Sequence, residues 1–362
     1  MEVSHTTAKR KAICWRLGTA VILIAALVFW CEVFVFYVTL WKNCKWPAFD
    51  NASIEHAKVM LISDTHLLGE RKGHWFDKLR REWQMYISYR AAISMFRPEY
   101  VFMLGDILDE GQIASDQQFE VYVETFKRIF DVDEDVKRVV VVGNHDIGFH
   151  DRVLYFDPYL RGRFENAFNT SLVDIIQIKG SHFITVNSMA LQRDGCHLCN
   201  RAIEEIKSFG RQLSSCRKTA TCSRPILLMH FPLYRKSDEN CNEIDSDKSE
   251  NKKVKFKPTV DCVSAESTKF ILEQLKPRLI FTGHTHFGCL VKHTDEQIEE
   301  WTLASFSWRN IASPSFILAR ISKETYRINK CLLPNEIAVI STYVVTLLTL
   351  LLYTVFKCKK HL

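Results

Sequence analysis

Five short polar motifs in the chain carry residue types that bind divalent metal ions. They are SDTH, GDILD, GNHD, a single histidine and GHTH, which begin at Ser63, Gly105, Gly143, His230 and Gly283. Carboxylates, imidazoles and one amide oxygen suit cations such as Mn, Fe or Zn better than copper or an iron–sulfur cluster. A carboxylate can bridge two cations through its two oxygens, so the motifs together are typical of a site for a pair of divalent cations.

A short apolar run precedes each motif. The runs are Lys58–Ile62, Tyr100–Leu104, Arg138–Val142, Pro225–Met229 and Arg278–Phe281. Continuous apolar residues over this length predict strands that are buried on both faces of a sheet. Ligand sites in α/β sheets lie at the carboxyl ends of such strands, so we expect the five motifs to gather there.

Helical and further strand patterns complete the prediction of an α/β fold. Helical periodicity covers Phe76–Phe96 and Ala265–Leu275, between the apolar runs. Strands that alternate with helices indicate a layered α/β domain. A weaker strand-rich pattern runs from Cys289 to Asn329. The charged stretch 236–258 is expected to be a solvated surface loop inserted in the domain.

Each motif taken alone is weak support for a metal site. Asp-x-His is more often a turn than a ligand pair, Gly-Asp after a strand is common, and an isolated histidine such as His230 is more often a core or surface residue. GNHD and GHTH are much rarer sequences. All five in this order, each behind an apolar run, favour a metal site over coincidence.

The ordered set DxH, GDxxD, GNHD, H and GHxH resembles the motif pattern of the calcineurin-like metallophosphoesterase superfamily, over about residues 56–325. The resemblance implies a four-layer sandwich of two mixed β-sheets flanked by helices, and a metal-dependent phosphoric ester hydrolase. It implies that one metal is held by Asp64, His66 and His286 and the other by Asn144, His230 and His284, with Asp106 as the bridge.

The resemblance also implies roles for residues around the metals. His145 is expected to stabilise the transition state or protonate the leaving oxygen, with Asp146 orienting its ring. Asp109 is expected to shape its loop rather than bind metal. Two cations in such a site activate a water for in-line attack on phosphorus. Manganese is the expected metal, with zinc and iron as alternatives.

Two departures from other branches of the superfamily narrow the expected activity. The second motif reads GDILDEG, which lacks the arginine of the GDxVDRG motif in Ser/Thr protein phosphatases. Asp109 stands where purple acid phosphatases carry a tyrosine ligand. The resemblance that remains is to the phosphodiesterase branch.

Two long apolar stretches near the chain ends predict transmembrane helices. Residues 17–40 contain a single carboxylate, Glu32, and residues 337–356 contain no charge. About 20 apolar residues cross a bilayer as a helix, and the first stretch is longer than the apolar region of a signal peptide, the alternative interpretation. Because a carboxylate is costly in lipid, Glu32 is expected to face a partner helix or lie near a membrane edge.

Basic residues flank both stretches on their outer sides, in residues 1–16 and 357–362. Positive charge marks the cytosolic side, so both tails are expected in the cytosol and residues 41–336 in a lumen. Lys359 and Lys360 stand fourth and third from the carboxyl terminus, which resembles a dilysine signal read by coatomer. The net charge of +6 lies largely in the tails, and no basic stripe with interleaved aromatics occurs, which argues against nucleic acid binding.

Cysteines and sequons fit an oxidising compartment. Nine cysteines lie between the predicted spans. Cys196 and Cys199 have the spacing of zinc ligands, but no second pair matches it, so disulfides within residues 196–262 are favoured over zinc. The odd count predicts at least one free or intermolecular thiol. Asn51 and Asn169 begin glycosylation sequons, and Asn169 is the better candidate because Asn51 adjoins the membrane.

Two spans, this motif set and a basic tail together resemble a membrane-anchored branch of the superfamily that remodels GPI anchors. That resemblance implies removal of an ethanolamine-phosphate side branch from a GPI mannose, and transport of GPI-anchored proteins out of the endoplasmic reticulum. The expected location is the membrane of exit sites, the ER–Golgi intermediate compartment and the cis-Golgi. Two alternatives remain open: a lumenal phosphoesterase for another membrane-proximal diester, and a non-catalytic cargo receptor or scaffold.

Overall fold

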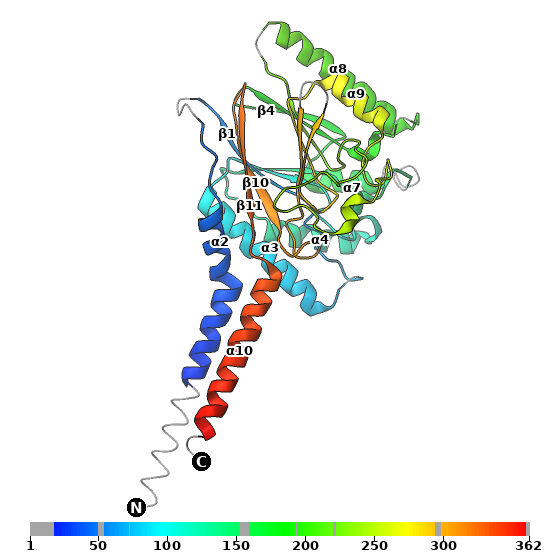
Figure 1. Ribbon diagram of the computed structural model, residues 1–362. Helices are drawn as coiled ribbons and strands as arrows, with labels where there is room; N and C mark the ends of the chain where they lie inside the picture. Colours follow the sequence, from blue (N-terminus) through cyan, green and yellow to red (C-terminus); the bar gives the residue numbers. More distant parts are fainter. Residues whose placement is uncertain are drawn as a thin grey trace, which may run out of the picture.

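The computed structural model describes residues 18–49, 54–71, 73–151, 159–192, 194–219, 222–293 and 298–359. The N-terminal tail, the first residue of the predicted span 17–40, the Asn51 sequon and Lys360 lie outside these residues. Two β-sheets with their helices make up the middle of the chain, and two long helices project from one side of it (Figure 1).

The first sheet has five strands in the order β11-β10-β1-β2-β3. Strands β1, β2 and β3 are parallel, whereas β10 is antiparallel to β1 and β11 is antiparallel to β10. The bounds are β1 Ala57–Ile62, β2 Tyr100–Leu104, β3 Lys137–Val141, β10 Ser315–Ile321 and β11 Tyr326–Leu332. Three predicted strands lie here, each within one residue of its predicted ends.

The second sheet has six strands in the order β4-β5-β6-β7-β9-β8. Strands β5, β6, β7 and β9 are parallel, and the outer strands β4 and β8 are antiparallel to their neighbours. The bounds are β4 Val173–Ile178, β5 Ser181–Val186, β6 Ile226–Met229, β7 Leu279–Thr282, β8 Cys289–His293 and β9 Ile298–Thr302. The predicted strands at β6 and β7 are confirmed, and the β4–β5 hairpin was not predicted.

Helices cover the outer faces of the two sheets (Figure 1). The longer ones are α3 Trp75–Phe96, α4 Asp116–Ile129, α7 Tyr159–Phe168, α8 His197–Lys218 and α9 Ala265–Leu275. The shorter ones are α5 Asn144–Ile147, η2 Gly111–Ile113, η3 Ser188–Ala190 and η4 Glu250–Lys253. Helices α3 and α4 pack on the first sheet, and α8 and α9 pack on the second. The expected four-layer sandwich of two mixed sheets flanked by helices is confirmed.

An apolar layer fills the space between the sheets. Val59 and Leu61 of β1 and Phe102 of β2 face Phe183 and Phe281 of the second sheet, and all five are fully buried. The rings of Phe102 and Phe183 stack at 5.1 Å. The alternate residues of the same strands belong to a second core that includes the helices. The strands are therefore buried on both faces, as their continuous apolarity predicted.

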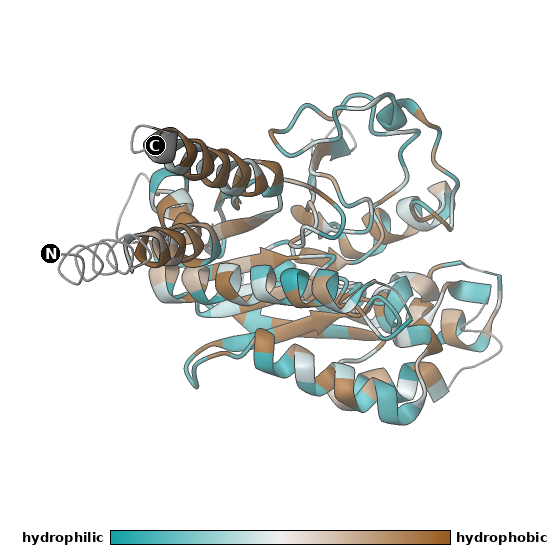
Figure 2. Cartoon of the chain, turned by 90° about the horizontal axis from the view of Figure 1, so that it is seen from below, coloured by the Kyte–Doolittle hydropathy of each residue, from teal (hydrophilic) through white to brown (hydrophobic). Residues whose placement is uncertain are grey.

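Two apolar helices, Gly18–Asn43 and Glu336–Phe356, are long and apolar enough to cross a membrane by length and composition. The first includes a π-helical turn, η1 (Trp30–Phe34), followed by α2 (Val35–Asn43), and the second forms most of α10 (Glu336–Lys359). Hydrophobic residues dominate both helices along their length (Figure 2). The two helices lie side by side (Figure 1).

The first helix differs from the predicted span 17–40 at its C-terminal end. Phe36 and Leu40 of α2 are fully buried against the rest of the protein, so this part of the predicted span packs on protein. Glu32, just before α2, accepts a hydrogen bond of 2.8 Å from the Tyr343 hydroxyl of α10. Glu32 therefore faces a partner helix, one of the two environments expected for it.

Disulfides join segments that are far apart in the sequence. The nine cysteines between the terminal helices are all described, and eight of them form the pairs Cys44–Cys331, Cys196–Cys199, Cys216–Cys222 and Cys241–Cys289. Cys262 is free and buried, as the odd count predicted. The prediction of disulfides within residues 196–262 is confirmed by Cys196–Cys199 and Cys216–Cys222. The other two pairs were not predicted, because the fold brings together cysteines whose sequence separations are 287 and 48.

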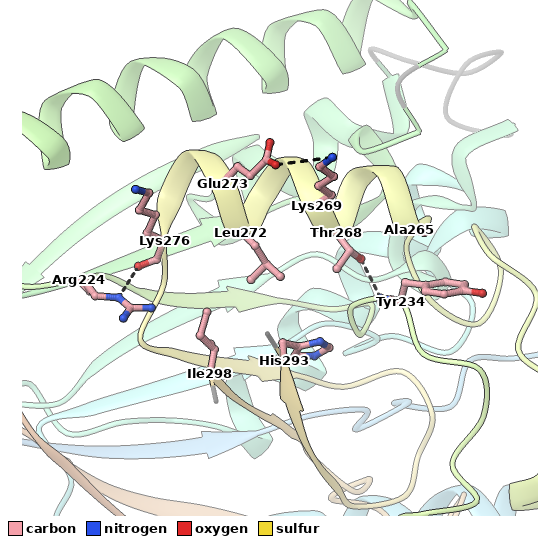
Figure 3. Close-up of a pocket in the computed structure, with 10 residues that line it drawn as sticks. All are labelled: Arg224, Tyr234, Ala265, Thr268, Lys269, Leu272, Glu273, Lys276, His293 and Ile298. Carbon is pink, nitrogen blue, oxygen red and sulfur yellow. Dashed lines mark hydrogen bonds and ion pairs between the residues drawn. The ribbon is translucent and has the colours of Figure 1, made fainter. Parts of the chain in front are cut away.

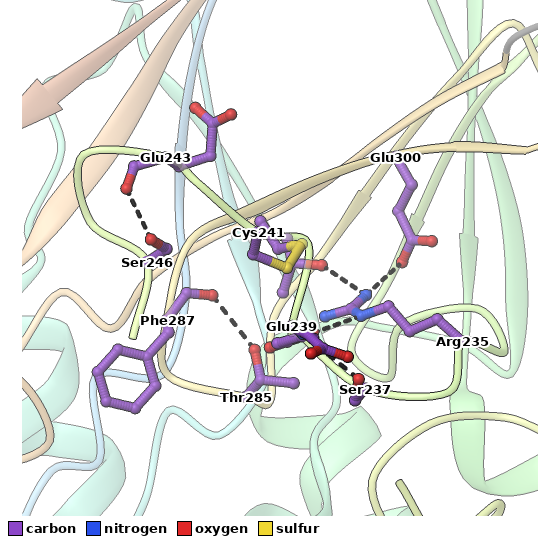
Figure 4. Close-up of a disulfide and its surroundings, with 12 residues drawn as sticks. Arg235, Ser237, Glu239, Cys241, Glu243, Ser246, Thr285, Phe287 and Glu300 are labelled. Atoms are coloured by element: carbon purple, nitrogen blue, oxygen red, sulfur yellow. Dashed lines mark hydrogen bonds and ion pairs between the residues drawn. A yellow bond between two sulfur atoms is a disulfide. The ribbon is translucent and has the colours of Figure 1, made fainter. Parts of the chain in front are cut away.

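The inserted stretch 236–258 is not the purely solvated loop that its composition predicts. Cys241 and Asp245 are buried within it. Asp245 pairs with Lys330 at 2.6 Å and accepts a hydrogen bond of 2.6 Å from Ser315. The Cys241–Cys289 disulfide lies close to Thr285, which belongs to the GHTH motif (Figure 4). Polar composition concealed these contacts, because charged residues are buried when they are paired.

Candidate metal centre

The five motifs meet at the carboxyl ends of strands from both sheets. Strands β1, β2 and β3 lead into SDTH, GDILD and GNHD, while β6 and β7 lead into His230 and GHTH. The first group belongs to one sheet and the second to the other. All seven expected metal ligands come together between them: Asp64, His66, Asp106, Asn144, His230, His284 and His286.

One group of ligands consists of Asp64, His66 and His286. The Nε2 atoms of His66 and His286 are 3.0 Å apart, and Asp64 Oδ1 lies 3.8 Å from the first and 3.7 Å from the second. Asp64 is fully buried and His66 is nearly so. Three ligand atoms that converge at this spacing can hold one cation.

A second group consists of Asp106, His230 and His284, with Asn144 beside them. His230 Nε2 lies 3.3 Å from Asp106 Oδ2, 3.1 Å from Asn144 Oδ1 and 3.3 Å from His284 Nδ1. Asp106 Oδ2 is also 3.6 Å from Nε2 of His66, which belongs to the first group. Asp106 therefore stands between the two groups, where a bridging carboxylate has to be.

Hydrogen bonds on the far side of three imidazoles fix their orientation. Nδ1 of His230 bonds to the Leu104 carbonyl at 2.7 Å, and Nε2 of His284 bonds to the Val260 carbonyl at 2.7 Å. Nδ1 of His66 bonds to the Asp109 carboxylate at 3.0 Å. In each ring the other nitrogen faces the centre. Metal-binding histidines are oriented in this way, by a carbonyl or carboxylate behind the ring.

The backbone adopts left-handed conformations at the expected ligands. Asp64, His66, Asp106, His284 and His286 have positive φ angles between 44° and 76°. Residues other than glycine seldom adopt this region, and such strain persists where the surrounding structure enforces it, commonly at functional sites. The loops thus hold the ligand side chains in orientations that an unstrained turn does not provide.

Charge in the centre also fits divalent cations. Burial favours the neutral form of Asp64, but its hydrogen bond to His66 and the charges of His230 and His286 outweigh burial and lower its pKa to about 2. Burial and the charge of His230 lower the pKa of His284 to about 3, so this ring is neutral, as a metal ligand must be.

Two other imidazoles carry protons that cations can replace. Burial opposes protonation of His66, but hydrogen bonds to Asp109 and Asp64 and the charge of Asp106 raise its pKa to about 10. Burial is likewise outweighed at His230, where Asp106 raises the pKa to about 9. Positive charge is therefore required beside these carboxylates. Divalent cations held by these residues would supply it and would displace the protons, so the residues fit a pair of metal ions.

Asp146 contacts different groups from those expected. Its Oδ1 accepts a hydrogen bond from the Leu108 N–H at 2.9 Å, and its Oδ2 accepts one from the Gly143 N–H at 2.8 Å. Asp146 therefore ties the GDILD loop to the GNHD loop. This corrects the expectation that Asp146 orients the ring of His145.

Asp109 stands behind the His145 ring instead. His145 Nδ1 is 2.9 Å from the Asp109 carbonyl oxygen and 3.6 Å from its Oδ1. The same carboxylate bonds to His66, so Asp109 positions both an expected ligand and the expected proton donor. From the sequence, Asp109 was expected only to shape its loop. The available signal was the second aspartate of GDILD, which follows a ligand by three residues.

Arg309 was not singled out from the sequence. Its guanidinium is 4.0 Å from Asp109 Oδ2, and its side chain is 37% exposed. A positively charged side chain therefore lies at the rim of the centre. A planar guanidinium suits phosphate oxygens. Arg309 could not be recognised from the sequence, because it lies after β9 and belongs to none of the five motifs.

Two other features of the described residues do not belong to this centre. His150 and Asp194 lie beside Cys196 and Cys199, but these cysteines pair with each other and so offer no thiolate. A cavity of about 690 Å³ lies beside α9 and is lined by residues that include Lys269 (Figure 3). None of the expected ligands is among the residues that line it.

Gly143→Ala is predicted to displace Asp106. A Cβ at Gly143 would lie 2.2 Å from both Oδ1 and the backbone nitrogen of Asp106. Overpacking of this kind costs about 1–3 kcal/mol, so we expect a lower Tm together with reduced metal content. Gly162→Ala is the matched control, because a Cβ there meets nothing within 4 Å. Full metal content and unchanged Tm in Gly143→Ala would contradict the geometry.

The family of the protein follows from its similarity to known proteins. Residues 57–288 match the family model for calcineurin-like phosphoesterases. The chain therefore belongs to the calcineurin-like phosphoesterase family, and it is a metal-dependent phosphoesterase with a site for two divalent metal ions.

The chain is similar to metallophosphoesterase 1 proteins over most of its length. The chain is 42% identical to metallophosphoesterase 1 of Ailuropoda melanoleuca over 339 residues, which cover 89% of this chain and 85% of that protein. It is 40% identical to the metallophosphoesterase 1 homolog of Drosophila melanogaster, with 87% and 86% covered. Among solved structures, a dimetal phosphatase from Danio rerio aligns with 77% of this chain and 99% of its own, with a TM-score of 0.47 and 13% identity.

Proposed function

We propose that this phosphoesterase is a phosphodiesterase that acts on a diester close to a membrane surface. The substrate we propose is the ethanolamine-phosphate side branch on a mannose of GPI anchors. Removal of this branch would promote transport of GPI-anchored proteins out of the endoplasmic reticulum. The chain's similarity to metallophosphoesterase 1 proteins and the position of the metal centre next to the terminal helices support the proposal.

One short segment, Ser305–Arg309, links the metal centre to the terminal helices and carries the proposal. Ser305 Oγ donates to the Asp64 carbonyl at 2.6 Å. Three residues later, the Trp308 ring lies 5.7 Å from Phe36 of α2. Its indole N–H donates to the carbonyl of Pro334, just before α10, at 2.9 Å. A substrate held at the membrane therefore needs to extend only a short way to reach the centre.

The residues of the centre divide the chemistry between them. The expected ligands would hold two divalent cations, which we propose are Mn²⁺; when bound, these would stabilise charge on the phosphate oxygens and lower the pKa of a water. Asp106 holds the two ligand groups together. Because Nδ1 of His145 donates to the Asp109 carbonyl, its Nε2 is free to protonate the leaving oxygen. Arg309 at the rim binds a phosphate oxygen of the substrate.

The proposed setting is the lumen of the early secretory pathway. Both terminal helices cross the membrane, with the tails in the cytosol and the α/β domain in the lumen. Four disulfides among the described residues suit that oxidising compartment. Coatomer reads Lys359 and Lys360 and returns the enzyme, so that it cycles through exit sites, the intermediate compartment and the cis-Golgi.

Activity of purified full-length protein against matched substrates tests the function. We expect hydrolysis of GPI glycans that carry ethanolamine phosphate, with release of phosphoethanolamine, and little hydrolysis of phosphomonoesters. Hydrolysis of simple diesters without release from GPI glycans would favour a different membrane-proximal diester. A protein that binds two metals and hydrolyses neither would favour the non-catalytic scaffold.

The glycan on Asn169 is predicted to show which side of the membrane the domain faces and which compartment of the secretory pathway the protein reaches. Asn169 is exposed at the end of α7, so it should be glycosylated if the domain is lumenal, and the glycan should remain sensitive to endoglycosidase H. Replacing Lys359 and Lys360 with serine should yield resistant glycans. The Lys359→Arg, Lys360→Arg control keeps the charge that sets topology. An unglycosylated Asn169 would contradict the lumenal orientation, and sensitive glycans in both double variants would contradict the dilysine signal.

A further inference from the structure

Helix α3 carries an exposed apolar stripe, which consists of Trp75, Phe76, Leu79 and Trp83. These side chains are 68%, 56%, 56% and 37% exposed. Their spacing places them on one face of a helix that turns once every 3.6 residues. Two tryptophans, a phenylalanine and a leucine gathered on an open face are unusual for a surface in contact with water, and such patches mark interaction sites.

The stripe lies along the N-terminal half of α3, whereas the buried residues of this helix lie along its C-terminal half, from Gln84 to Phe96. Met85, Tyr89 and Ile93 of the same helix are buried in the core. Helix α3 is therefore packed into the protein along its C-terminal half and leaves apolar side chains exposed along its N-terminal half. The exposed face needs another occupant to remove it from water.

Ion pairs place the stripe at the level where both terminal helices meet the domain. Arg80 lies 3.7 Å from Glu32 of the first helix and 3.3 Å from Glu336 at the start of α10. Trp83, a member of the stripe, donates its indole N–H to the Glu32 carbonyl at 3.0 Å. Figure 1 shows α3 on the side of the domain from which these helices project.

Charge marks the boundary of the apolar helices at this level. Beyond Glu32, towards the N-terminus, the first helix exposes Ile22 and Phe29, and beyond Glu336 α10 exposes Ile337 and Val344. Carboxylates and guanidinium groups are costly in hydrocarbon, so the edge of a bilayer around these helices falls near Arg80. The stripe lies on the same helix within about one turn of Arg80.

We propose that the α3 stripe lies in the interfacial layer of the lipid bilayer; this inference rests on the proposed membrane anchoring of the terminal helices. Tryptophan favours this layer, because its ring is apolar and its N–H is polar. A helix with such a face lies in the membrane plane and buries its apolar side among lipid headgroups and upper acyl chains. The α/β domain is then held to the bilayer at three points.

The third point fixes how the metal centre faces the membrane. The side chain of Gln84, next to Trp83, donates to the Phe306 carbonyl at 3.2 Å and accepts from the backbone N–H of Trp308 at 3.0 Å. Helix α3 thereby holds the segment Ser305–Arg309, which contacts Asp64. The first helix and α10 run antiparallel and side by side, so as a pair they can tilt in the bilayer together with the domain that is packed on them. A third contact prevents that tilt and keeps the centre at a fixed height above the lipid.

Lipid-dependent quenching of a fluorophore on the stripe tests the proposal. Leu79→Cys is labelled with an environment-sensitive dye in full-length protein in nanodiscs, in a background with Cys14, Cys31, Cys262 and Cys358 replaced by serine. The matched positions are Val345→Cys on α10 and Val254→Cys on the inserted stretch, 62% and 63% exposed. Lipids with spin labels on the upper acyl chain serve as quenchers.

The proposal predicts strong quenching at Leu79 and Val345 and none at Val254. Quenching at Val345 without quenching at Leu79 would overturn the stripe's place in the membrane and leave the anchoring intact. Absence of quenching at both positions would overturn the anchoring as well. Energy transfer between labels at Leu79 on two copies, without lipid quenching, would show that a second copy covers the stripe, which also overturns the proposal.

Discussion

Asp106→Asn is expected to remove both metal ions and reduce phosphodiesterase activity by at least about 10³-fold. Asp106 stands between the two ligand groups, 3.3 Å from His230 and 3.6 Å from His66. An amide supplies one neutral oxygen where two cations need a shared negative charge. Metal ions contribute several kcal/mol of transition-state stabilisation, and each 1.36 kcal/mol is tenfold in rate. Elemental analysis and turnover of the same sample measure the result.

A buried carboxylate outside the centre provides the control for Asp106→Asn. Glu300 is fully buried on β9 and pairs with His293, so Glu300→Gln also removes a buried charge. We expect this variant to lose some stability and keep both metals. Two full equivalents of metal in Asp106→Asn would show that this carboxylate does not bridge the ions.

His145→Ala is expected to lower turnover by about 10²–10⁴-fold and leave both metals bound. The ring bonds to Asp109 on one side, and its side chain is 28% exposed, so it borders the space open to substrate. Loss of a proton donor should matter most for alkoxide leaving groups and least for nitrophenolate, which leaves without a proton. The ratio of the two rates separates proton donation from a structural defect.

His182→Ala provides the matched control, because this half-buried histidine lies on β5, outside the metal centre. We expect it to leave both rates unchanged. If His145→Ala lost metal, or slowed both leaving groups equally, the assigned proton transfer would be wrong.

The sequence predicted the elements whose signals are local. Five strands are continuous apolar runs with a motif behind each, and α9 occupies the predicted residues Ala265–Leu275. The gathering of the five motifs was predictable for the same reason, because each follows the carboxyl end of a strand, whereas the seven expected ligands were implied by the family resemblance. The β4–β5 hairpin was missed because it is an outer pair of mixed burial, with no motif behind it to mark it.

Features that depend on contacts between distant residues were not predictable. Asp109 and Asp146 are both aspartates near a ligand, and only the folded loops decide which one meets His145. The composition of 236–258 predicted a solvated loop. Its buried residues Asp245 and Cys241 could not be recognised, because their partners Lys330 and Cys289 lie far away in the sequence. Positive φ at five ligands likewise depends on surrounding packing rather than on local propensity.

The proposed function requires that phosphodiester hydrolysis depends on two metal ions in this centre. The direct measurement is a titration of metal-free full-length protein with Mn²⁺, with bound metal and hydrolysis of a GPI glycan carrying ethanolamine phosphate followed in the same samples. We predict two equivalents per chain and activity that rises with occupancy of the second site. Activity that persists without metal, or two bound equivalents with no hydrolysis of any phosphodiester, would contradict the claim.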